Sequence, residues 1–497
     1  MAPLRTGKKQ AAQHIAIYSV GSIVRQLAGF IMLPIYTSYL SPADYGVVSL
    51  LIVMIALFEL VIGARFAQAV PKFYYEKEDE QHRSSVISTA LLVTGFVSLI
   101  STLVVALNSE LIARILFGDK SYNIHVALYG TLLFTSALEA YGLTFFRLKE
   151  KPFIFIANSI SKLVLQLSLN ILFVVYLNKG VIGVIWSALL ASSVMASVAA
   201  CYILYNSGIK YKGNLVKRLF KFSWPLWLAG IAGLYVASSN RYFIRIFSDL
   251  DQVGLFELAA KFSTILPLLI WNPFSQWWQT ERFKLYQSED KGVTVFPLVF
   301  DGITTIMVLV ATGIALFSGP VISIMASPPF HPAATAVPIL VFGVLISNLR
   351  FFFFFSFLVT ERTIVITYIK YASALIATVL YLVLIPKLGF LGAASSILAT
   401  EIFVLLVSFF LSKKYFDNGI KLYYAATLIV AGIGITLVDH FLWGLEHSIW
   451  KMLAGKTLLA FVLVVFLAVS VFLNTKLKNS LIDFKDEIKG KYIKTNL

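Results

Sequence analysis

The sequence contains very little cysteine and no recognisable nucleotide or metal motif. Cys201 is the single cysteine among 497 residues, so the chain can form neither an internal disulfide nor a CxxC metal site. The six histidines are scattered, without HExxH or a paired-ligand spacing, and no GxxxxGKS/T phosphate loop occurs. We therefore expect no cofactor, no metal and no catalytic residue, and we predict that the protein is not an enzyme.

Charge is also scarce. Charged residues make up 13% of the chain, against roughly 25% in an ordinary soluble domain, while 59% of residues are hydrophobic and the mean hydropathy is +0.83. This composition predicts a multi-pass membrane protein. The net charge of +16 could suggest nucleic acid, but a nucleic-acid-binding protein gathers basic residues in a patch on a polar domain, and the sequence contains no such domain.

Long apolar runs fill most of the chain. The basic N-terminus, "MAPLRTGKKQAAQ", is followed by an apolar segment that is too long for a signal peptide, so we interpret it as a retained first helix. A membrane helix needs about 20 largely apolar residues, and roughly fourteen segments meet this criterion. The sequence thus predicts an all-α integral membrane protein of about fourteen transmembrane helices.

Basic residues occur mainly in alternate loops. The intervening loops are nearly bare, holding for example Asp44 or Lys179. Because Lys and Arg concentrate in cytoplasmic loops, this alternation predicts that both termini are cytoplasmic. The basic segments lie at residues 5–9, 72–83, 147–151, 210–221, 282–291, 413–421 and 476–494, and Arg362 belongs to the same set.

The chain repeats itself at an offset of about two hundred residues. "YLSPADYGVVSL" matches "IFSDLDQVGLFEL" with Gly46 on Gly254, and "NKGVIGVIWSALLAS" matches "PKLGFLGAASSILAT" with Gly180 on Gly389. Between them, "PKFYYEKEDEQ" matches "ERFKLYQSEDK" and "FRLKEKP" matches "FLVTERT". We predict two pseudo-symmetric six-helix lobes related by an axis along the membrane normal, with a site between them. The predicted divisions are residues 1–210, 211–414, and 415–497 for two additional helices and a basic cytoplasmic tail.

Charged residues inside the spans are the main functional candidates, because such charges are costly in lipid and face a bundle interior or a water-filled cavity. Four cations fall in the first two helices of the two lobes, a quasi-symmetric placement. Together they would form a positively charged chamber suited to a phosphate or pyrophosphate. These predicted substrate-binding residues are Arg25, Arg65, Arg241 and Lys261.

Simpler interpretations remain open for several of these charges. Glu257 and Lys261 are spaced i, i+4 and could neutralise each other, and Arg65 and Arg241 could lie within snorkelling distance of an interface. A second group is expected to lock helices together: Lys162, Lys370, Arg350, Glu139 and Glu401. The candidate carboxylates for a coupling ion, H⁺ or Na⁺, are Glu59, Asp301 and Glu257.

Two aromatic runs have a structural interpretation. "RFFFFFSF", residues 350–357, is expected to form a lipid-facing or packing surface. "WNPFSQWWQTERF", residues 271–283, is typical of an aromatic belt at the membrane interface.

Taken together, these features resemble the polysaccharide-transporter branch of the multidrug/oligosaccharidyl-lipid/polysaccharide (MOP) superfamily, which includes the O-antigen flippases. The resemblance rests on the fourteen spans, the duplicated lobes, Arg25 in the first helix and "LPIYTSYLSPADYGVVSL", of which Leu40–Gly46 is the most specific piece. It implies an inner-membrane protein that moves a polyprenyl-pyrophosphate-linked oligosaccharide, such as an O-antigen, capsule or exopolysaccharide unit, to the outer leaflet. The chamber cations would meet the pyrophosphate or acidic sugars, and polysaccharide-assembly proteins would be partners.

Three other functions are weighed against the flippase. A cation-coupled multidrug exporter should have an acidic and apolar cavity, whereas the early helices here are cationic. A membrane polysaccharide polymerase or ligase needs a sizeable outer loop with catalytic residues, and "GPVISIMASPPFHP" offers only His331. A scaffold without transport would not need the repeat and the charges within the spans.

Overall fold

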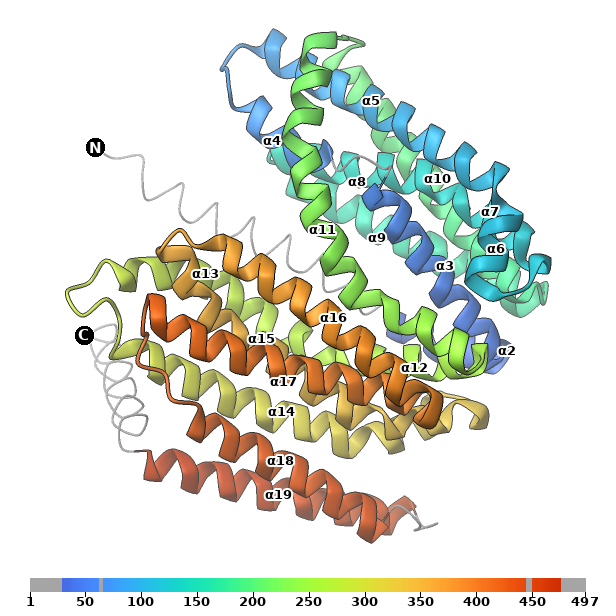
Figure 1. Cartoon of the computed structure of the whole chain (residues 1–497). Helices are drawn as coiled ribbons and strands as arrows, with labels where there is room; N and C mark the ends of the chain where they lie inside the picture. Colours follow the sequence, from blue (N-terminus) through green and yellow to red (C-terminus); the bar gives the residue numbers. More distant parts are fainter. Residues whose placement is uncertain (1–28, 62–65, 444–448, 475–497) are drawn as a thin grey trace, which may run out of the picture. The chain divides into compact units, whose positions relative to one another are not determined.

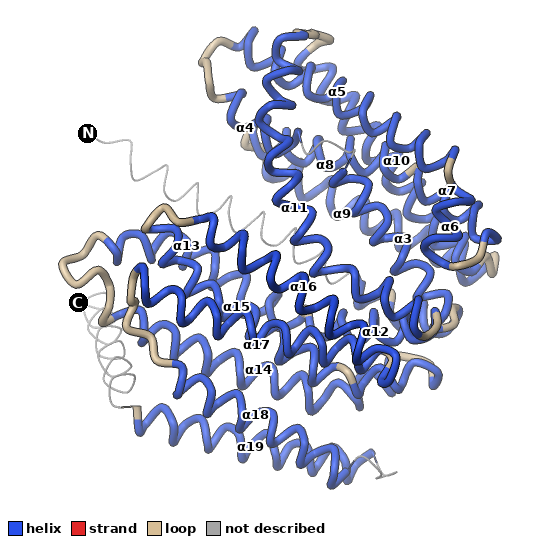
Figure 2. Tube along the Cα trace, in the orientation of Figure 1, coloured by secondary structure: helices blue, strands red, loops and turns tan. Residues whose placement is uncertain are grey.

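The computed structural model describes residues 29–61, 66–443 and 449–474 (Figure 1). Helices joined by short connections make up these residues, and no strand occurs among them (Figure 2). Within the described part, twelve helical segments are long and apolar enough to cross a membrane. They do not include α11 (Gly213–Phe247), and the first predicted span lies largely outside the described residues. The protein is therefore an all-α, multi-pass membrane protein, while the count of fourteen and the cytoplasmic termini remain predictions.

The chain divides into two compact units, residues 1–254 and 255–497, and the boundary falls within α12 (Leu250–Ser263). The divisions predicted after residues 210 and 414 remain predictions. The other helices described in the first unit are α2 (Leu33–Tyr39), α3 (Pro42–Val61), α4 (Phe66–Tyr74), α5 (Glu80–Leu107), α6 (Ser109–Phe117), η1 (Lys120–Tyr122), α7 (Asn123–Gly130), α8 (Leu132–Leu148), α9 (Pro152–Asn170), the π-helix η2 (Ile171–Tyr176) and α10 (Gly180–Ser207).

The second unit continues from the last part of α12. Its helices are the π-helix η3 (Pro267–Trp271), α13 (Asn272–Tyr286), α14 (Val295–Met325), the 3₁₀ helix η4 (Pro328–Thr335), α15 (Val337–Val359), α16 (Thr363–Leu388), α17 (Phe390–Tyr415), α18 (Leu422–Trp443) and α19 (Ile449–Leu473).

Polar side chains cap the first turns of α3 and α5. Before α3, Ser41 and Asp44 form a capping box: the Asp44 carboxylate accepts from the Ser41 amide at 3.0 Å, and the Ser41 hydroxyl accepts from the Asp44 amide at 3.1 Å. Before α5, the Asp79 carboxylate accepts from the amides of Gln81 and His82. These side chains satisfy amides that have no partner within their own helix.

Segments that the sequence repeat pairs contain matching turns. Glu150 after α8 and Glu361 after α15 both have positive φ, 52° and 58°. In each turn the next residue's amide donates 2.8 Å to a carbonyl five residues back, Lys151 to Phe146 and Arg362 to Phe357. The matched glycines at residues 180 and 389 also share positive φ, 54° and 56°. The paired positions thus share the sign of φ, and the two glutamate turns share the same closing hydrogen bond.

Each unit has its own hydrophobic core. In the second unit, "RFFFFFSF" packs inward: Phe352, Phe353 and Phe355 are fully buried, so the packing interpretation is confirmed over a lipid-facing one. The predicted aromatic belt is divided between two faces: Trp278 is fully buried against Phe352, with ring centroids 5.3 Å apart, whereas Trp277 and Phe283 are 52% and 43% exposed. The first unit's core gathers around α5, α8 and α10.

Candidate functional site

The structure describes two of the four predicted chamber cations. Arg25 and Arg65 lie outside the described residues. Arg241 is on α11 in the first unit, and Lys261 is on α12 in the second unit. Both side chains are half-buried within helices that carry mostly apolar residues. Neither of the two lies in a solvent-exposed loop.

Arg241 lies where α11 contacts α3. Its Nε donates to Ser49 Oγ on α3 at 3.2 Å, and its Nη1 donates to Ala237 O and Asn240 Oδ1, both at 3.1 Å. Because a guanidinium is planar and presents its donors in a fixed fork, these bonds orient it. Its contacts with oxygens of α3 and α11 hold a cation at a defined place in the first unit.

The helix that carries Ser49 is itself held by an unusually close crossing. A Cβ on Gly46 of α3 would lie 2.2 Å from Leu250 O, and a Cβ on Gly254 of α12 would lie 1.9 Å from Pro42 O. The Asp251 carboxylate accepts a hydrogen bond of 3.0 Å from the Ala43 amide, near the start of α3. Only glycine permits this approach, so the two residues aligned by the sequence repeat also meet in space.

Glu59 connects α3 to α8. The Ser136 hydroxyl donates to Glu59 Oε1 at 2.8 Å, and the carboxylate also interacts electrostatically with Tyr129 on α7. Tyr129 was not predicted as part of a polar site, because a tyrosine in an apolar run gives no signal of its own in the sequence. The carboxylate therefore lies inside the helix bundle, as an ion-coupling group requires, but the coupling role stays a prediction.

The two other candidate carboxylates lie in the second unit. Glu257 and Lys261 interact electrostatically one turn apart on α12, as their i, i+4 spacing predicts. Asp301 on α14 accepts a hydrogen bond of 3.0 Å from Asn474 Nδ2, just after α19. One turn further on, the Thr305 and Tyr424 hydroxyls lie 3.2 Å apart. Asp301 thus belongs to a polar contact between α14 and the last two helices.

Four of the five residues predicted to lock helices do so. Lys162 on α9 forms an ion pair with Glu139 on α8, which also accepts a hydrogen bond from Ser192 on α10. Arg350 on α15 forms an ion pair with Glu401 on α17. These contacts confirm the structural interpretation of both pairs, because each joins different helices within one unit.

One buried pair was missed by the sequence. Lys456 on α19 and Asp439 on α18 form an ion pair with Nζ–Oδ2 at 2.5 Å, and their side chains are only 8% and 13% exposed. Both residues lie near the ends of apolar runs, where a charge is normally expected in a wet loop. They lie seventeen residues apart in the sequence, so no i, i+3 or i, i+4 spacing indicated the pair.

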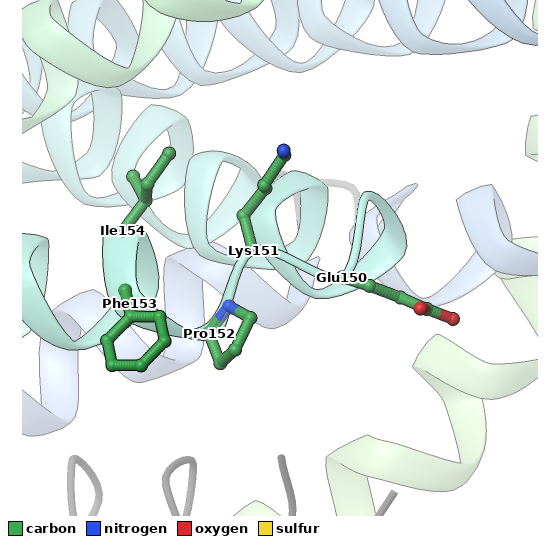
Figure 3. A pocket seen from close by; sticks show the side chains of 5 residues that line it. All are labelled: Glu150, Lys151, Pro152, Phe153 and Ile154. Carbon is green, nitrogen blue, oxygen red and sulfur yellow. The ribbon is translucent and has the colours of Figure 1, made fainter. Parts of the chain in front are cut away.

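A shallow pocket opens at the connection between α8 and α9 (Figure 3). Its lining consists of consecutive residues, and the side chains of Glu150 and Lys151 point in different directions. Within the described part of the chain, no three His, Cys, Asp or Glu side chains are grouped in a way that could hold a metal ion. The pocket is therefore a surface hollow and does not bring together residues from different helices. It is lined by Glu150, Lys151, Pro152, Phe153 and Ile154.

Comparison with known proteins agrees with this architecture. No curated protein sequence matches the chain. The structure is similar to a lipid II flippase, MurJ, in an inward closed conformation, with a TM-score of 0.73 and 13% identity over 93% of this chain and 99% of the other. It is also similar to an inward-facing multidrug resistance MATE transporter of the MOP superfamily, with a TM-score of 0.55 and 14% identity over 81% of this chain and 95% of the other.

At these identities the likeness shows the fold, and the family follows from the sequence. The family model described as "Polysaccharide biosynthesis protein" matches residues 11–277, which is more than half of the chain. The matched range includes Arg241, Glu59 and the Gly46–Gly254 crossing. The protein therefore belongs to the polysaccharide biosynthesis protein family and has the membrane fold of the MOP superfamily.

Proposed function

We propose that the protein is a flippase that carries a polyprenyl-pyrophosphate-linked oligosaccharide from the cytoplasmic to the outer leaflet of the cell inner membrane. The cargo would be an O-antigen, capsule or exopolysaccharide repeat unit. A pyrophosphate and many hydroxyls cannot enter hydrocarbon without losing their hydration, so such a lipid needs a polar path. Alternating access through a cationic cavity would provide that path, and polysaccharide-assembly proteins would supply and remove the lipid.

The observation that carries this proposal is the placement of Arg241. A guanidinium cannot be neutralised by deprotonation, so inside a membrane span it must face protein, water or a ligand. At the α3–α11 contact it is oriented by Ser49 and Asn240, and a planar fork of donors can bind phosphate oxygens bidentately. In the proposed mechanism Arg25, Arg65 and Lys261 add positive charge along the same path.

Transport needs a source of energy, and an ion gradient would serve. Protonation or Na⁺ binding at a carboxylate among Glu59, Asp301 and Glu257 would bias the protein between its two access states. Glu59 is the first to test, because its Ser136 contact joins two helices of one unit and its charge state would affect their packing.

The test is flipping of a fluorescent polyprenyl-pyrophosphate oligosaccharide in proteoliposomes. We expect Arg241→Ala and Arg25→Ala to lose most activity, with the Lys variants intermediate because an ammonium keeps the charge and loses the bidentate geometry. Arg218→Gln is the matched control: Arg218 is on the same helix α11, but its ion pair with Glu76 is exposed. Its flipping should equal wild type.

Equal flipping by all variants at equal insertion would contradict the cationic path. A second candidate is a cation-coupled multidrug exporter, which the similarity to the MATE transporter favours. Export of a cationic dye by wild type, with no flipping of the oligosaccharide lipid, would support the exporter and overturn the flippase.

A further inference from the structure

The repeat pairs polar residues at corresponding positions of its two halves. Counting from the matched turns, Glu139 and Arg350 each lie eleven residues before Glu150 and Glu361. In the same way, position 192 corresponds to position 401, because both lie twelve residues after the matched glycines at 180 and 389. The third pair is Lys162 and Ser373, each twelve residues after its glutamate turn.

In each half of the repeat these positions hold one ion pair, but the cation and the carboxylate lie on different helices in the two halves. In the first lobe the carboxylate is on α8 and the cation on α9, and they form the Glu139–Lys162 pair. In the second lobe the cation is on α15 and the carboxylate on α17, and they form the Arg350–Glu401 pair. The corresponding position on α16 is Ser373, whose hydroxyl donates to the Lys370 carbonyl. Each pair joins one cation to one carboxylate, so neither pair has a net charge.

Lys370 is therefore an additional cation. It is on α16, one turn before Ser373, and its side chain is exposed. In the part of the chain that the structure describes, its ammonium forms no ion pair or hydrogen bond with the protein. The expectation that Lys370 locks helices together is accordingly wrong: its turn of α16 has no carboxylate partner, because Glu401 is engaged by Arg350.

The position of Lys370 along α16 indicates which part of the membrane its ammonium reaches. It stands seven residues after the start of α16 at Thr363, which is about 10 Å along a helix. A lysine side chain can extend from that depth to the headgroup level. Tyr368 and Tyr371, 68% and 56% exposed on the same turns, are the residue type that gathers at this interface. The predicted orientation, in which Arg362 belongs to a cytoplasmic loop, would put this end of α16 in the cytoplasmic leaflet.

We propose that Lys370 binds the phosphate of an anionic membrane phospholipid at this end of α16. The ammonium donates charge-assisted hydrogen bonds to the phosphate oxygens, and this compensates the cost of a charge inside a span. The site holds a bulk lipid at the surface of the second unit, separately from any transported cargo. It is thus independent of the flippase proposal.

The test measures lipid retention by the full-length protein in detergent, using native mass spectrometry. Phosphatidylglycerol is the probe and zwitterionic phosphatidylcholine the comparison. We expect Lys370→Gln to bind phosphatidylglycerol about fivefold more weakly, as one surface cation contributes, with phosphatidylcholine little changed. Lys370→Arg should restore binding. Lys387→Gln is the matched control, since Lys387 is also exposed but lies at the opposite end of α16.

Unchanged phosphatidylglycerol binding by Lys370→Gln would overturn the proposal. A third probe, a polyprenyl pyrophosphate, separates the two phosphate sources. If Lys370→Gln weakens only the binding of that probe, the residue meets the cargo lipid and the proposed bulk-lipid site is wrong. Circular dichroism and size exclusion confirm that each variant is folded before the lipid is added.

Discussion

Gly46 and Gly254 lie against each other's helices, each facing the carbonyl oxygen four residues before the other: Leu250 O faces Gly46, and Pro42 O faces Gly254. The contact is reciprocal, as expected for equivalent positions of an internal repeat. Helices in lipid gain association energy from close backbone packing, for which small residues are required. At this crossing, two residues that the sequence repeat aligns are packed directly against each other's helices.

Gly46→Ala should destabilise the protein, because the added methyl would lie 2.2 Å from Leu250 O, and backbone cannot move aside as a flexible side chain does. Overpacking of this kind costs about 1–3 kcal/mol. Thermal unfolding in detergent measures the loss. Gly313→Ala in α14 is the control: in the described part of the chain an alanine methyl there would meet no atom within 4 Å beyond its own helix backbone, and Ala favours a helix. If both variants melt like wild type, the close approach is not required for the fold.

Glu139→Gln should also destabilise the protein. It leaves the Lys162 ammonium without its carboxylate in a site where Glu139 is only 9% exposed. We expect a loss on the order of 1–3 kcal/mol, moderated because helices unfolded within lipid also find polar partners. The exposed pair Glu110–Arg114 on α6 is the control, and Glu110→Gln should change stability little. Equal losses for both variants would show that burial does not set the strength of the Glu139 pair.

Arg282→Lys should lower thermal stability although it keeps the charge. Arg282 is 5% exposed and its guanidinium lies 4.3 Å from the ring centroid of Phe351 and 5.1 Å from that of Phe355. An ammonium is more strongly hydrated and cannot stack on the rings, so its burial costs more. Arg114→Lys, at an exposed position, is the comparison and should have no effect. A stable Arg282→Lys variant would mean that charge alone suffices there.

Hydrogen exchange in the connection between α13 and α14 should not depend on Asp290 protonation between pH 7 and pH 5. The Thr294 hydroxyl, together with the Gly292 amide and the Ser288 hydroxyl, donates to the Asp290 carboxylate and holds its pKa far below the ordinary value. Because the folded pKa is lowered, this stabilisation is complete above about pH 4, the unfolded pKa, and is lost only as pH falls through the folded pKa.

Asp290→Asn removes the charge at every pH and should speed exchange of the Gly292 and Thr294 amides at pH 7. Exchange rates are corrected for the intrinsic effect of pH. Glu289→Gln, a change at the exposed neighbouring residue, should leave the same amides protected. A wild-type loop that loses protection already between pH 7 and pH 5 would contradict the lowered pKa of Asp290.

Much of the fold and part of the site could be predicted from the sequence. Apolar runs of membrane length identified the helices, and segments paired by the repeat have matching turns at Glu150 and Glu361. The rule that a charge in a span needs a partner correctly identified Lys162, Glu139, Arg350 and Glu401 as helix locks. It failed for Lys370, because a span charge can also be satisfied by lipid, and the sequence does not distinguish the two environments.

The sequence did not indicate which side chains contact one another across helices. Arg282 was assigned to a basic loop but is buried against phenylalanines, and the Asp439–Lys456 pair was not foreseen. Helices that are apolar all round carry no amphipathic stripe, so their rotation about the axis cannot be deduced from periodicity.

The amino-acid sequence by itself determined the membrane class, the helix repertoire and the duplication, because hydrophobic length and repeated turn residues are local properties. Only the tertiary structure decided which side chains meet: Gly46 with Gly254, Arg241 with Ser49, and Arg350 with Glu401. Those contacts depend on how packed helices are rotated and shifted against one another, and in lipid that is set by close packing and polar pairing rather than by hydrophobicity.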